Sequence, residues 1–130
     1  MKDFWTLDAG RQAHELNHWV HALVDSYPGL ARHRLAAEMR RASTEVACNI
    51  ARGCGSSSNE GAERWYYNVA LGALASLDYL MYLAFDLGLI PRGCAERFLE
   101  MKVGVQERVD AMLNPKETKK GAARSLTLVQ

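Results

Sequence analysis

The stretch from Leu35 to Gly53 constrains the fold of this 130-residue chain more than any other segment. Its apolar residues recur at intervals of three or four, which places them on one face of a helix that turns about 100° per residue. These residues are Leu35, Met39, Ala42, Val46 and Ile50. A helix with one apolar face must bury that face against other elements. The segment therefore predicts a helix packed in a core, with Gly53 as its C-cap.

Three further segments carry helical patterns. One spans about residues 7–26 and stops before Pro28, which cannot continue a helix. The longest spans about residues 60–87 and is expected to begin at a capping box made by Ser57 and Glu60. The last begins at Pro91, a residue that the first turn of a helix tolerates. Four amphipathic helices with short connections predict an all-α fold, an antiparallel up-and-down four-helix bundle within residues 1–115.

The apolar arc of the segment 60–87 is wider than one core requires. It covers roughly 180°, whereas about 100° is enough for a helix to face its own core. We expect one stripe of this arc to face the core and the excess to face a second subunit, with Leu74 and Met81 in that contact. The core predicted for the whole bundle comprises Leu16, Val20, Met39, Val46, Ile50, Val69, Leu80, Leu83, Phe98 and Val105.

Charge is nearly balanced, with 16 Lys plus Arg against 15 Asp plus Glu, which argues against a strongly basic nucleic-acid binder. The basic excess is concentrated between Lys116 and Arg124, so residues 116–130 are expected to form a basic, flexible tail outside the bundle. In the segment 35–53, Arg34, Glu38, Arg41 and Glu45 alternate in sign at helical spacing and are expected to pair within the helix. Arg32 and Arg40 are expected to stay unpaired.

The three cysteines, Cys48, Cys54 and Cys94, are odd in number and lack the C-x-x-C spacing of zinc and redox sites. We therefore expect free thiols and a cytoplasmic location. The segment 69–90 is long enough to span a bilayer, but Asp78 and Asp86 inside it would each cost up to ~2.5–3.5 kcal/mol there. A helix buried in a soluble protein is the better interpretation, and no membrane partner is expected.

His14, His18 and His21 form a row with Asp25 on the polar side of the first helix. Such a row fits solvated or subunit-contact histidines, a pH-sensitive contact, or a metal site. Because no second ligand-bearing element can be placed beside it, we expect no dedicated metal and no cofactor. No nucleophile motif or di-iron E-x-x-H pattern occurs in the sequence, so no catalytic residues are predicted and the protein is expected not to be an enzyme.

Residue identities add a family resemblance to this pattern. The central stretch contains Arg40-Arg41-Ala42-Ser43, then Asn49-Ile50-Ala51 and Gly53, and further matches are Phe4, Leu7, Pro28, Leu71-Gly72, Leu74, Leu77 and Asp86-Leu87-Gly88. In order and spacing these residues resemble the small four-helix-bundle proteins encoded in the intervening sequences of bacterial 23S ribosomal RNA genes. The resemblance covers roughly residues 4–113. The chain departs from the usual family residues at Glu38, Arg52, Ala73 and Ser76.

The resemblance implies a homopentameric ring, in which Arg41 and Glu45 pair across subunits. It also implies a non-enzymatic accessory protein associated with RNA or DNA, because relatives serve reverse transcriptases in diversity-generating retroelements. Repetition of weak basic patches around a ring would make such binding multivalent. The residues expected to bind nucleic acid are Arg32, Arg40, Arg41, Lys116, Lys119 and Lys120. The alternative is a self-assembling scaffold that binds only protein.

Overall fold

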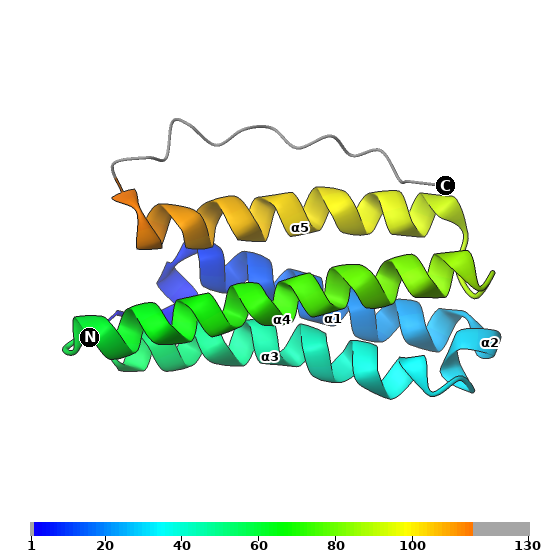
Figure 1. The fold of residues 1–130 in the computed structure, drawn as a ribbon, viewed down its shortest axis with the longest axis horizontal. Helices are drawn as coiled ribbons and strands as arrows, with labels where there is room; N and C mark the ends of the chain where they lie inside the picture. Colours follow the sequence, from blue (N-terminus) through cyan, green and yellow to red (C-terminus); the bar gives the residue numbers. More distant parts are fainter. Residues whose placement is uncertain (1, 116–130) are drawn as a thin grey trace.

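The structure, a computed structural model, describes residues 2–115. It is all-helical over this range, and its four long helices run alternately up and down (Figure 1). The elements are the 3-10 helix η1 (Phe4–Thr6), α1 (Asp8–Ser26), the one-turn α2 (Pro28–Ala31), α3 (Leu35–Gly55), α4 (Glu60–Asp86) and α5 (Arg92–Leu113). Helices α1 and α4 each pack against both α3 and α5, which closes the bundle. The predicted four-helix architecture is confirmed.

Seven of the ten predicted core residues are fully buried, and the exceptions all belong to α4. Val69, Leu80 and Leu83 are only half-buried. The face of α4 that enters the core is instead formed by Tyr67, Ala70, Leu74, Leu77, Met81 and Ala84. Leu74 and Met81 are each 1% exposed, so their predicted place in a subunit interface is wrong.

The two apolar faces of α4 were exchanged in the prediction because both satisfy helical spacing. Packing against α3 decides between them. Gly53 of α3 lies against the buried ring of Tyr67, and a Cβ atom on that glycine would stand 2.3 Å from the Tyr67 Cε1 atom. Without a side chain at residue 53, α3 and α4 can approach closely enough for the Tyr67 ring to fit between them.

Gly53 is therefore a close-approach glycine and not the predicted C-cap. Helix α3 continues to Gly55, and Ser56 is the residue that follows its last turn. The predicted capping box at the start of α4 is also wrong, because Asn59 is the N-cap and its side chain accepts a hydrogen bond from the Ala62 amide at 3.1 Å. At the other end of α4, Gly88 has a φ of 74°, a left-handed conformation that glycine adopts without strain.

By length and composition, α4 is the one helix within residues 2–115 that is able to cross a membrane. In the fold, its core face packs between α3 and α5. Asp78, one of the two acids that argued against a membrane span, accepts a 2.6 Å hydrogen bond from the Lys102 ammonium of α5. Lys102 is 5% exposed and Asp78 is half-buried, so this ion pair is a partly buried link between α4 and α5.

Candidate interaction surfaces

The predicted nucleic-acid-binding arginines lie at the beginning of α3 and along its outer face. Arg32 and Arg41 are exposed, and neither forms an ion pair within residues 2–115. Arg40 was expected to be unpaired, but its Nη2 atom lies 3.4 Å from Asp25 Oδ1 of α1. The side chains of this pair are 36% and 76% exposed, so the contact is worth only about 0–1 kcal/mol. Arg40 thus contributes less free positive charge than Arg32 or Arg41.

The alternating charges of α3 do not neutralise one another as expected. Among the described residues, Arg34, Glu38, Arg41 and Glu45 form no ion pair with one another. Glu45 instead accepts a hydrogen bond from Asn49 Nδ2 at 3.1 Å and lies 3.4 Å from Arg52 Nη1. Arg34, which the sequence predicts to be paired, therefore has no acidic partner within residues 2–115. It lies seven residues from Arg41, on the same helix face and roughly 10 Å along the axis.

A buried polar seam joins α1 to α3 behind these arginines. Ser43 is fully buried, and its hydroxyl donates to Asn17 Oδ1 at 2.8 Å. Thr44 donates to the same oxygen at 3.1 Å, and His21 Nε2 lies 3.3 Å from the Thr44 hydroxyl. The signature residue Ser43 is therefore a structural link with its hydrogen-bonding capacity satisfied. Asn17, which no sequence pattern singled out, is the residue that both hydroxyls contact.

The histidine row of α1 is divided among different surroundings. His21 is half-buried in the polar seam, whereas His14 and His18 are exposed. The His14 ring packs edge-on against Trp5, with 5.2 Å between the ring centroids. Within residues 2–115, no group of three or more His, Cys, Asp or Glu side chains is placed to hold a metal ion.

The outward side of α4 carries a large exposed apolar surface. Trp65, Tyr79 and Leu87 are 61%, 62% and 51% exposed. These three residues share one helix face with the half-buried Val69 and Leu83 and with Gly72. The space beside Gly72 is open. We call these six residues the outer α4 face. It is the surplus apolar arc that the sequence indicated, although it is made of other residues than those predicted.

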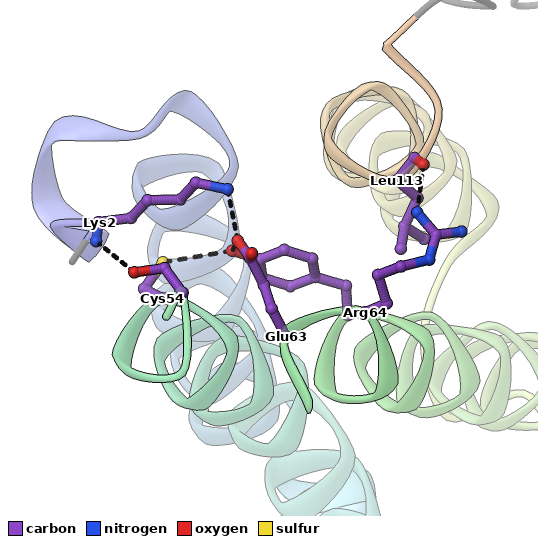
Figure 2. Close-up of polar contacts among 7 residues, drawn as sticks. Lys2, Cys54, Glu63, Arg64 and Leu113 are labelled. Carbon is purple, nitrogen blue, oxygen red and sulfur yellow. Dashed lines mark hydrogen bonds and ion pairs between the residues drawn. The ribbon is translucent and has the colours of Figure 1, made fainter. Parts of the chain in front are cut away.

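At the end of the bundle where α3 stops and α4 begins, Lys2 reaches over a buried polar cluster (Figure 2). The Lys2 ammonium forms an ion pair with Glu63, whose carboxylate also accepts a 2.8 Å hydrogen bond from the Tyr67 hydroxyl. The Tyr67 hydroxyl is 3.9 Å from the sulfur of Cys54. Ser57 accepts a 3.1 Å hydrogen bond from the Lys2 amide. From the sequence alone, Ser57 is predicted only as a helix cap and Cys54 only as a free thiol.

Burial and hydrogen bonding shift the pKa values in this cluster. Burial by itself would raise the pKa of Glu63, but the hydrogen bonds from Lys2 and Tyr67 outweigh it, and the pKa is lowered. The pKa of Tyr67 is raised, chiefly by burial and then by its hydrogen bond to Glu63. Burial also raises the pKa of the Cys54 thiol. At neutral pH the cluster therefore holds an ionised carboxylate, a neutral phenol and a neutral thiol.

The predicted tail lysines Lys116, Lys119 and Lys120 lie outside the described residues. Helix α5 ends at Leu113, whose carbonyl oxygen accepts a 2.6 Å hydrogen bond from Arg64 in the second turn of α4. This is the opposite end of the bundle from Arg32, which precedes α3 (Figure 1). The 22 residues of α5 separate the two ends by about 33 Å.

The fold and these surfaces define a small all-helical bundle protein with a row of exposed arginines on one helix and an exposed apolar face on another. The chain belongs to the 23S rRNA-intervening sequence protein family, whose model matches residues 6–114. The family resemblance found in the signature residues is thereby confirmed. A comparison with curated proteins found no match to the chain.

Proposed function

We propose that the protein is a non-enzymatic, self-associating accessory protein that binds RNA or DNA through repeated basic patches. The observation that carries this proposal is the set of exposed cations at the beginning of α3 and on its outer face: Arg32, Arg34 and Arg41 have no acidic partner within residues 2–115. The N-terminus of α3 adds positive partial charge at the same end of the molecule. Membership of a family described by ribosomal RNA intervening sequences is compatible with this role.

A single subunit would bind nucleic acid weakly, because affinity depends on how many phosphates are neutralised together. Self-association multiplies the same patch and makes binding multivalent. We propose the outer α4 face as the contact, because it carries Trp65, Tyr79 and Leu87, three of the four large hydrophobic side chains that are exposed among the described residues. The number five for the assembly comes only from the family resemblance, as does pairing of Arg41 with Glu45 across subunits.

RNA retention over a salt series tests the nucleic-acid part of the proposal. The variant Arg32→Ala/Arg41→Ala should bind labelled single-stranded RNA more weakly, and its log affinity should fall less steeply with log salt, by about 0.7 per lost phosphate contact. The matched control is Arg11→Ala/Arg97→Ala, which removes two arginines paired with Asp8 and Glu100 on other helices. No retention by the wild type at low salt, or equal losses in both variants, would reject the arginine patch.

Light scattering tests the assembly. Wild type should exceed the monomer mass at micromolar concentration, and Tyr79→Arg on the outer α4 face should reduce that mass. Trp5→Ala is the control, since Trp5 is 60% exposed but lies on η1. A monomeric wild type would refute self-association. An oligomer that retains its mass in Tyr79→Arg but binds no RNA would favour the alternative function, a protein-binding scaffold, with an interface elsewhere.

We also propose a protein partner and a cytoplasmic location. By family resemblance, the expected protein partner is a reverse transcriptase or another nucleic-acid-processing protein. Cys48, Cys54 and Cys94 are free thiols, which supports the proposed cytoplasmic location. Purification of the full chain from cells, with sequencing of the RNA and identification of the proteins that accompany it, would test both points.

A further inference from the structure

The segment of residues 2–7, here called the N-terminal strap, is fixed at one end and tied at the other. Near α1, the Asp3 side chain caps η1 by accepting a 3.0 Å hydrogen bond from the Trp5 amide. The Phe4 carbonyl lies against Gly10, and a Cβ atom on Gly10 would be 2.1 Å from the carbonyl oxygen. Phe4 and Leu7 also pack against the core. These backbone contacts hold the α1 end of the strap in place.

At the other end of the strap, Lys2 forms hydrogen bonds with the corner between α3 and α4. Among the described residues, the hydrogen bonds from the strap to this corner are the Lys2 amide to Ser57 Oγ and the Lys2 ammonium to Glu63. Lys2 lies over Glu63 and Cys54, which are 8% and 2% exposed (Figure 2). Tyr67, whose hydroxyl donates a hydrogen bond to Glu63, is 1% exposed. The burial of these three polar groups therefore depends on where Lys2 is held.

The ion pair that holds Lys2 is unevenly accessible. The Lys2 side chain is 46% exposed, whereas the side chain of Glu63 is 11% exposed. Solvent ions can reach the lysine, and a pair with one exposed partner is weakened by salt screening and by competing anions. In the Lys102 to Asp78 pair the lysine is the buried partner, at 6% exposed, and the carboxylate is 30% exposed, so solvent ions have less access to that ammonium than to Lys2.

We propose that the N-terminal strap is a latch: release of the Lys2 ammonium from Glu63 lifts the strap while the four-helix bundle stays folded, and opens the Cys54 thiol to solvent. Lys2 lies over Cys54 (Figure 2), and the charges of Lys2 and Asp3 both act on the Cys54 thiol, so this end of the strap is near the sulfur. The latch would respond to anions that compete for Lys2, and it would regulate which reagents or partners reach the corner between α3 and α4.

The rate of Cys54 alkylation by a maleimide tests the latch, in the full chain carrying Cys48→Ser and Cys94→Ser so that Cys54 is the sole thiol. Lys2→Met keeps an unbranched side chain as far as Cε but removes the ammonium group, and should speed alkylation about tenfold or more, because a charge-assisted hydrogen bond is lost. Raising NaCl from about 0.1 M to about 1 M should speed alkylation in the background protein and leave Lys2→Met nearly unchanged.

Leu30→Ala separates opening of the latch from unfolding of the bundle. Leu30 is fully buried in α2, at the far end from the strap, so its loss destabilises the bundle without touching Lys2. Alkylation through a lifted strap should depend little on low urea concentrations, whereas alkylation through global unfolding should rise steeply with urea in Leu30→Ala. Unchanged alkylation in Lys2→Met, or the same steep urea dependence in both variants, would overturn the proposal.

Discussion

Gly53→Ala is the sharpest test of how α3 and α4 pack. The added Cβ would lie 2.3 Å from Cε1 and 2.7 Å from Cδ1 of Tyr67, well inside contact distance. The ring cannot turn aside easily, because Tyr67 is 1% exposed and its hydroxyl is bonded to Glu63 at 2.8 Å. The two helices must therefore separate, and overpacking of this kind costs about 1–3 kcal/mol. Replacing glycine by alanine in a helix returns up to about 1 kcal/mol. Because the added Cβ would lie only 2.3 Å from a ring that cannot move aside, we expect the upper end of the overpacking cost and a net loss of about 2 kcal/mol.

Urea denaturation followed by circular dichroism measures this loss, and a thermal scan should show a midpoint lowered by about 3–6 °C for each kcal/mol. Gly93→Ala is the matched control, because Gly93 lies in the first turn of α5 and an added Cβ there meets nothing within 4 Å. The control should be neutral or slightly stabilised. A Gly53→Ala protein as stable as the wild type would show that the Tyr67 ring does not fill the space beside residue 53.

The other predictions concern the polar cluster and the two faces of α4. The pKa of Glu63 is lower in the folded protein than its ordinary value of 4.5, so its carboxylate stabilises the fold fully above pH 4.5. That stabilisation is lost as the pH falls through the pKa of the folded protein. In urea titrations below about pH 4.5, Glu63→Gln should therefore lose less stability than the wild type. The raised pKa of Tyr67 has the opposite sign: its contribution is full below pH 10 and lost above it, so Tyr67→Phe should flatten the alkaline fall in unfolding free energy. Leu77→Ala, at a fully buried site, should lower the free energy of unfolding by about 2–5 kcal/mol in chemical denaturation. Leu80→Ala, at a half-buried site, should lower it clearly less. The reverse order would show that the core face of α4 is the one predicted from the sequence.

The amino-acid sequence predicts the location of the candidate surfaces only in part. Arg32 and Arg41 are exposed as expected, because charged residues on the polar side of an amphipathic helix face solvent. The pairing of Arg40 with Asp25 was missed, since the two residues come from different helices and no local spacing relates them. Lys2 and Glu63 escaped notice for the same reason, as 61 positions separate them in the sequence.

Four helices, their approximate limits and most of the core follow from local signals, because periodic apolar spacing and the positions of Pro28, Gly88 and Pro91 act along the chain. The buried face of α4 and the role of Gly53 in helix approach depend on how the helices pack against one another. A helix that is apolar over half its circumference can be rotated about its axis to bury either of two apolar faces, and both faces show the same helical spacing. The choice between them depends on whether a large ring such as Tyr67 finds a neighbour without a side chain, and that neighbour lies on another helix.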